Sequence, residues 1–185
     1  MARAVLAIAS LLAISSGLGV AGCGGGGDKP EGDLPQAPAT LRVASTAFDD
    51  GGTIPRRFTC DGANVSPPLA FPQVPEGARE LALVVYDPDA DNFVHWSLVS
   101  MSRETALISA GRVPPGAVQT KNSFGDEKYG GPCPPEGDNP HRYVFALYAL
   151  SKPLDLDAGA SPEDVRKAIA DAATGRGTLT ASYGR

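Results

Sequence analysis

Short apolar runs of strand length, divided by turn-forming residues, constrain this chain more than any other feature of its sequence. The clearest runs cover Glu80 to Tyr86, Phe93 to Met101 and Tyr143 to Leu150. With 22 glycines and 17 prolines in 185 residues, but 42% hydrophobic residues, the turn formers indicate tight turns in a packed protein rather than disorder. Such runs at period two are typical of a β-sandwich or barrel, so a mainly β domain is predicted.

Three weaker strand signals lie outside these runs. Leu41 to Phe48 is predicted as a first strand that closes at a turn over residues 49–52, where glycine supplies the positive φ. Leu69 to Phe71 is predicted as a short edge strand, because prolines break the chain on both sides. Leu179 to Tyr183 is predicted as the last strand.

One or two peripheral helices are expected, and the C-terminal one is well signalled near residues 162–174. Ser161 is a good N-cap and Pro162 suits the first helical position, with two acids following in the first turn. Apolar residues then recur at helical spacing, and Gly175 or Gly177 is expected to end the helix.

The N-terminus predicts export. Residues 1–22 carry a single charge at Arg3, then an apolar segment, and end in small residues just before Cys23. This pattern resembles a bacterial lipobox, after which the signal peptide is removed and Cys23 is lipidated. The alternative, a membrane-spanning helix, is disfavoured because about 15 apolar residues fall short of the ~20 that a span needs.

The lipobox interpretation divides the chain into a signal peptide (residues 1–22), a Gly/Pro-rich tether (23–40) and a domain (41–185). The domain is expected to be anchored by lipid alone to the bacterial cell membrane or outer membrane, facing the periplasm or exterior. Cys60 and Cys133 remain there, where disulfides persist, so they are expected to pair.

The charge balance excludes some partners. The net charge is -5 and no cluster of lysine or arginine occurs, which argues against nucleic acid and against electrostatic docking on anionic lipid.

The stretch YDPDADNFVHW, residues 86–96, crowds carboxylates and a histidine between two predicted strands. Strand alternation predicts that His95 shares a face with Phe93 and Ser97 while Trp96 points the other way. By the same rule His141 and Tyr143 share a side, as do Asp87 and Asp89 if DPD is extended. Composition alone leaves a plain structural role open for both histidines.

Taken together, the motifs resemble the phosphatidylethanolamine-binding protein family, and in it the bacterial Raf-kinase-inhibitor-like branch. The matching pieces cover nearly all of residues 41–185 in order and are FDDGGTIPRRFTCDGANVSPPL, VPEGARELALVVYDPDADNFVHW, NSFGDEKYGGPCPPEG, HRYVFALYAL and SYGR. The chain departs from the family at Asp91, where many members have proline, and over residues 102–121, which match loosely.

This resemblance implies a two-sheet Greek-key β-sandwich with a small pocket for phosphate-like anions or phospholipid head groups. Carried over to this sequence, the pocket residues are Asp87, Asp89, His95, Gly131, Pro134, Pro135, His141 and Tyr143. Mammalian members also inhibit kinases, so an unknown protein target is a further expectation. No cofactor is implied.

Elementary chemistry assigns roles to these groups. A carboxylate at Asp87 would keep one histidine cationic and oriented for an anion, and Tyr143 would donate its hydroxyl. Backbone N–H groups around Gly130 and Gly131 could approach the ligand, and Asp89 could meet an ammonium group.

Three other functions fit parts of the same pattern. A metal site is disfavoured because the two histidines are far apart in sequence and no HxH or HExxH element occurs. A phosphoester hydrolase using an Asp/His pair stays open, although no GxSxG, Walker or CxxC motif is present. An inhibitor of a kinase or protease that acts through the pocket rim also stays open. The expected protein is a binding protein rather than an enzyme.

Overall fold

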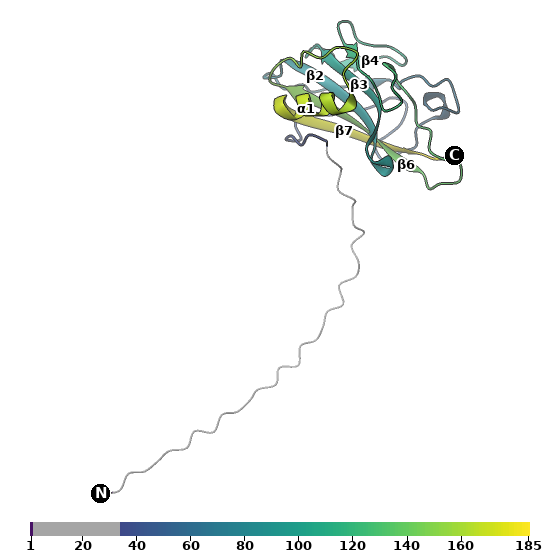
Figure 1. Ribbon diagram of the computed structural model, residues 1–185, viewed down its shortest axis with the longest axis horizontal. Helices are drawn as coiled ribbons and strands as arrows, with labels where there is room; N and C mark the ends of the chain where they lie inside the picture. The colour runs from purple at the N-terminus through teal and green to yellow at the C-terminus, as the bar shows by residue number, and fades with distance from the viewer. Residues whose placement is uncertain (2–33) are drawn as a thin grey trace.

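The structure is a computed structural model that describes Met1 and residues 34–185 (Figure 1). The predicted signal peptide, the lipidation site Cys23 and most of the tether lie outside the described residues and stay predictions. Among the residues described, no helix is both long and apolar enough to cross a membrane.

A five-stranded antiparallel sheet forms the centre of the domain (Figure 1). Its order in space is β5-β3-β2-β6-β7. The strands are β2 (Glu80–Asp87), β3 (Phe93–Met101), β5 (Val118–Gln119), β6 (His141–Leu150) and β7 (Ala173–Tyr183). The three long apolar runs of the sequence therefore form adjacent strands of one sheet, as their length and pattern predicted.

The strand order has the Greek-key form. Strands β2, β3 and β5 lie side by side in that order, although β4 of the second sheet comes between β3 and β5 in the chain, and β6 pairs with β2 on its other side. The resulting order β6-β2-β3-β5 places the fourth strand beside the first, as a Greek key requires.

A second, two-stranded sheet lies apart from the main one and joins β1 (Leu69–Ala70) to β4 (Leu107–Ile108). Two short 3₁₀ helices complete the set, η1 (Arg56–Phe58) and η2 (Pro88–Ala90). The core has two parts, one on each face of the main sheet. The larger contains side chains from β1, β4 and the loops; the smaller contains α1 (Pro162–Ala172). The fold is thus mainly β, sandwich-like, with two sheets and one α-helix, which confirms the predicted class.

Helix α1 begins where the sequence indicated. Ser161 accepts the backbone N–H of Asp164 at 3.2 Å, and the Asp164 carboxylate accepts the Ser161 backbone N–H at 3.0 Å, which makes a capping box. The expected end at Gly175 or Gly177 is wrong, because the helix ends at Ala172 and both glycines belong to β7. Strand β7 accordingly starts six residues before the predicted Leu179.

The predicted first strand over Leu41 to Phe48 is also absent from the described sheets. This segment makes a single isolated bridge, between Ala44 and Ala70 of β1. It also forms one backbone hydrogen bond to β7, from Leu41 N–H to the Arg176 carbonyl, so it pairs along neither strand for more than one residue. Its apolar residues still pack into the larger core, with Leu41, Val43 and Phe48 all buried. The turn after it does contain a glycine of positive φ, Gly51, at 74°.

Candidate functional site

A cavity of about 150 Å³ opens where β2 ends and β6 begins. We call it the His141 cavity. It is lined by Asp87, Ala90, Phe93, His95, Phe124, Cys133, Pro134, Pro135, His141 and Tyr143. Six of the eight predicted ligand residues are therefore brought together, from three strands and one loop that are far apart in sequence.

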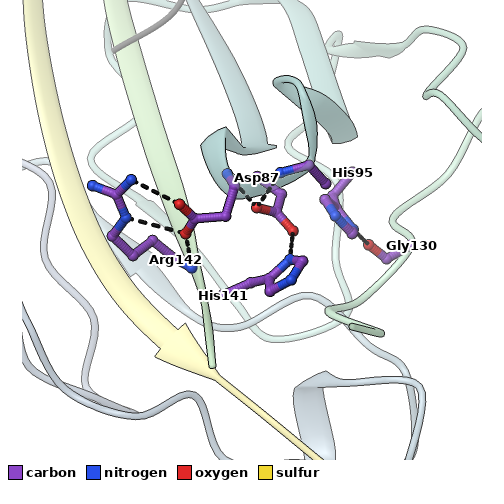
Figure 2. A network of polar contacts seen from close by, with 7 residues as sticks. Asp87, His95, Gly130, His141 and Arg142 are labelled. Carbon is purple, nitrogen blue, oxygen red and sulfur yellow. Dashed lines mark hydrogen bonds and ion pairs between the residues drawn. The ribbon is translucent and has the colours of Figure 1, made fainter. Parts of the chain in front are cut away.

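Asp87 is the organising group of this cavity (Figure 2). One oxygen, Oδ1, accepts the backbone N–H groups of Asp89 at 2.8 Å and Ala90 at 3.2 Å, so the side chain caps η2. The other oxygen, Oδ2, accepts Nδ1 of His141 at 2.7 Å. Because an ionised carboxylate only accepts hydrogen bonds, Asp87 fixes the proton of His141 on Nδ1 and turns Nε2 away from itself.

His95 enters the cavity through a β-bulge. The pairing of β2 with β3 passes from Val85 opposite Trp96 to Tyr86 opposite Val94, which leaves His95 without an opposite residue. Its Nδ1 donates to the carbonyl oxygen of Gly130 at 2.8 Å (Figure 2). His95 lines the cavity, and its Nδ1 is held by Gly130.

The bulge corrects the predicted face assignment. Trp96 lies in the larger core cluster with Val85, so it shares the face of His95 instead of opposing it. Ser97 pairs with Val84, which belongs to the other face. Simple alternation failed here because an extra residue in one strand reverses the parity of everything beyond it.

Burial decides the charge of His95, whose residue is only 4% exposed. Desolvation lowers the pKa of its imidazole below the ordinary value, while the carbonyl of Gly130 and the charge of Asp87 oppose that shift. The neutral ring carries its proton on Nδ1, since Nδ1 donates to Gly130. Nε2 of the neutral ring has no proton, so it can donate a hydrogen bond to an anion only after the ring has taken up a second proton.

Aromatic rings enclose His95. Its ring lies edge-on to Tyr143, Phe93 and Phe124, with centroids 5.2, 5.3 and 5.6 Å away. Burial raises the pKa of the Tyr143 hydroxyl, and the neighbouring Asp87 carboxylate raises it further, so Tyr143 is a neutral hydrogen-bond donor.

Asp89 lies outside the lining of the His141 cavity. Its carboxylate holds Arg142 instead, with Oδ1 accepting Nη2 at 2.8 Å and Oδ2 accepting Nε at 3.1 Å (Figure 2). The expectation that Asp87 and Asp89 share a side of an extended DPD segment is wrong, because Pro88–Ala90 forms η2. The ligand role predicted for Asp89 stays a prediction.

Gly131 supports the cavity wall without lining it. Its N–H donates to Oδ1 of Asn64 at 2.7 Å, and the N–H of Gly130 donates to the His95 carbonyl at 3.0 Å. Both backbone donors that were expected to face a ligand are thus used within the protein. A Cβ at Gly131 would lie 2.5 Å from the Phe58 carbonyl oxygen, so only glycine fits there.

The predicted prolines do line the cavity, Pro134 and Pro135, and the structure joins the neighbouring Cys133 to Cys60 in a disulfide. The link fixes the proline segment against the loop that follows η1. Sequence reasoning missed the walls formed by Phe93 and Phe124, and only the alternation at Phe93 offered a signal. Phe124 lies in a loop, where no strand or helix periodicity could predict that its side chain lines the cavity. No cluster of three or more metal-ligating side chains occurs in the described part of the chain.

Comparisons with known proteins identify the family and support the fold. The sequence profile of the phosphatidylethanolamine-binding protein family matches residues 44–184. A protein of Methanothermobacter thermautotrophicus, named UPF0098 protein, is 45% identical over 152 residues, covering 78% of this chain and 99% of that protein. LppC of Mycobacterium tuberculosis, named as a candidate lipoprotein, is 39% identical over 197 residues, covering 98% of this chain and 96% of that protein.

A solved structure is also similar. That of Escherichia coli YbcL, described as a new member of the mammalian PEBP family, has a TM-score of 0.76 and 30% sequence identity. The similarity covers 80% of this chain and 99% of that one.

Proposed function

This chain belongs to the phosphatidylethanolamine-binding protein family, and from that premise we propose that it is a membrane-anchored binding protein for phosphate-type anions. The ligand would be a free phosphate-like anion or the head group of a phospholipid, held in the His141 cavity. The proposed role is binding without turnover.

One observation carries this proposal: the cavity presents two imidazole edges whose opposite nitrogens are already fixed. Nδ1 of His141 is held by Asp87 at 2.7 Å, and Nδ1 of His95 is held by Gly130 at 2.8 Å. Each ring therefore points Nε2 away from its anchor. When protonated, both edges donate charge-assisted hydrogen bonds, which are the stronger kind for an anion.

The acid in the cavity favours the same ligand. Asp87 is the sole carboxylate among the described lining residues, and its two oxygens already accept three hydrogen bonds from the protein. It is therefore occupied as a positioning group rather than exposed to repel an anion. The Tyr143 hydroxyl adds a neutral donor to the same wall.

The size of the cavity limits what can enter. A volume of about 150 Å³ suits a phosphate group with a short substituent, while a lipid tail would have to remain outside. Phe124, which is 52% exposed, stands at the rim where such a substituent would leave.

The membrane anchor is proposed at Cys23. The small-residue approach to this cysteine supports it, as does the similarity to LppC, whose name describes a candidate lipoprotein and which matches 98% of this chain. Replacing Cys23→Ser is expected to release the protein into the soluble envelope fraction. Retention of the mutant in the membrane after a high-salt wash would reject the anchor.

A hydrolase would use the same Asp87–His141 pair as an acid–base dyad. However, the described lining residues offer no free thiol or aliphatic hydroxyl as a nucleophile, because Cys133 is tied to Cys60. Binding without turnover is thus the better supported proposal, and hydrolysis becomes an outcome of the test.

The test is calorimetric titration of the purified protein with phosphate and phosphoethanolamine, beside an assay for turnover of p-nitrophenyl phosphate. His141→Ala is expected to weaken binding about ten- to a hundred-fold, the value of one charge-assisted hydrogen bond. Unchanged affinity in both His95→Ala and His141→Ala, with native circular dichroism, would refute the site. Turnover that disappears in His141→Ala would favour the hydrolase, and capture of a partner protein through the cavity rim would favour the inhibitor.

A further inference from the structure

A second cavity shares no lining residue with the His141 cavity. Its volume is about 270 Å³, and we call it the Trp96 cavity. The residues that matter for its chemistry are Asn64, Trp96, Arg112, Gln119, Lys128 and Tyr129. They come from the loop after η1, from β3 and β5, and from the loops before β5 and β6.

Aromatic rings form the floor of this cavity. Trp96 and Tyr129 pack edge to face, with centroids 5.6 Å apart and an interplanar angle of 87°. Both are almost fully buried, at 1% and 8% exposure, so only a small part of each side chain is accessible from the cavity. Such a floor favours a small apolar group above it.

The walls present hydrogen-bond donors, and this follows from fixed amide orientations. The indole N–H of Trp96 donates to Oε1 of Gln119 at 2.8 Å, so the Gln119 amide nitrogen points away from the indole. The N–H of Gly131 donates to Oδ1 of Asn64 at 2.7 Å, with the same effect on the Asn64 amide nitrogen. Because both amide oxygens are occupied, each amide has its NH₂ group left to donate.

Two cations stand at the rim, Arg112 and Lys128, both exposed. Lys128 also approaches Asp126 at 3.4 Å, but this pair is solvent-exposed on both sides and is therefore weak. None of the described residues that line the cavity is a carboxylate. In a chain of net charge -5, a cavity with two cations, two amide donors and no acid is a marked local reversal of charge.

We propose that the Trp96 cavity binds a small organic anion, whose charged group meets Arg112 and Lys128 while its apolar part rests against Trp96 and Tyr129. The class is that of an aromatic or short aliphatic carboxylate. This site is separate from the His141 cavity and does not depend on the function proposed there.

The chain carries its own probe for this site, because Trp96 is its only tryptophan. The experiment is titration of the purified full-length protein, in nonionic detergent, with sodium benzoate at constant ionic strength while Trp96 fluorescence is recorded. Benzamide, which has the same ring and no charge, is the ligand control. A saturable change with benzoate and none with benzamide is expected.

Variants assign that signal to the cavity. Arg112→Gln and Lys128→Gln are each expected to weaken benzoate binding about ten-fold or more, because each removes one charge-assisted contact. Arg79→Gln is the matched control, since Arg79 is also an exposed arginine and lines neither cavity. His141→Ala is expected to leave benzoate binding unchanged, which separates this site from the proposed function.

Three results would overturn the proposal. They are no saturable fluorescence change with benzoate, binding of benzamide as tight as that of benzoate, or wild-type affinity for benzoate in both Arg112→Gln and Lys128→Gln. Both positions are exposed, so loss of folding is not expected, and far-ultraviolet circular dichroism of each variant checks this. A benzoate response lost in His141→Ala but kept in Arg112→Gln would place the anion in the other cavity and would equally reject this site.

Discussion

The two cavities hold their polar groups in opposite ways. In the His141 cavity Asp87 and His95 are buried and His141 is partly buried, and each imidazole is fixed by another protein group, as Asp87 fixes His141. In the Trp96 cavity the charges of Arg112 and Lys128 are exposed, and the buried part is aromatic. Buried charges must be paired to be tolerated, whereas exposed ones need no partner.

The two cavities should therefore respond to different changes. The His141 cavity depends on geometry and on protonation, because burial lowers the pKa of His95 and its ring gains a charge only when pH falls. The Trp96 cavity depends on permanent charges, because arginine and lysine stay protonated near neutral pH.

The largest effect is expected from removing the disulfide, which borders the His141 cavity through Cys133 but not the Trp96 cavity. Cys60→Ser combined with Cys133→Ser should lower the free energy of unfolding by about 4 kcal/mol, since the link closes a loop with a sequence separation of 73. Urea denaturation measures this, with reduced wild type as the control. A double variant as stable as oxidised wild type would contradict it.

Replacing Asp87→Asn should come next. The charge-assisted bond to His141 is lost, so we expect about 1.5–3 kcal/mol less stability and a clear loss of phosphate affinity. Benzoate binding in the Trp96 cavity should be unaffected. Asp49→Asn, at an exposed turn, is the matched control in thermal denaturation and calorimetry. Equal stability of the two variants would remove Asp87 from its organising role.

The pH dependence separates the cavities more finely. Burial lowers the pKa of His95 in the folded protein, so the unfolded chain binds a proton before the folded chain does as pH falls through about 6.5. The free energy of unfolding should therefore decrease as pH falls below about 6.5. A bound anion favours protonated His95, so sulfate affinity should rise as pH falls below about 6.5. Benzoate affinity should stay flat from pH 8 to about 5.5.

Calorimetry with sulfate, whose charge is constant over this range, measures that slope, and His95→Gln should reduce it. A slope of the same size in His95→Gln would mean that another group carries the pH dependence. The sequence alone suggested a window of about 6–8 from an unshifted histidine. The burial of His95 moves the expected window to lower pH.

The smallest stability effect is expected for Phe124→Ala. Phe124 is 52% exposed, so the free energy of unfolding should change by less than about 0.5 kcal/mol. Its ring nevertheless lies 5.6 Å from that of His95 and helps to exclude water. Removing it should raise the pKa of His95 toward the ordinary value, as followed by NMR titration of the imidazole. An unchanged titration midpoint would show that the other rings suffice.

Sequence-based prediction was most successful for elements whose own residues carry a regular pattern. The runs that became β2, β3 and β6 were evident, and so was the start of α1, because capping residues act locally. Membership of the His141 cavity came mostly from the family motifs. Local patterns failed where tertiary contacts decide: the bulge at His95, the helical turn at Pro88–Ala90, and the pairing of Asp89 with Arg142. The second cavity had no signal, since five separate segments build it.

Helix α1 and strand β7 meet without a connecting loop, so the number of residues between the helix and the first paired residue of β7 cannot change. Ala173 closes the helix by donating its N–H to the carbonyl of Ile169, and it is also the first residue of β7. An inserted residue there would have no loop to absorb it. It would instead slip β7 by one position along β6 and turn Leu179 and Ala181 out of the core. Insertions should therefore be excluded at residue 173.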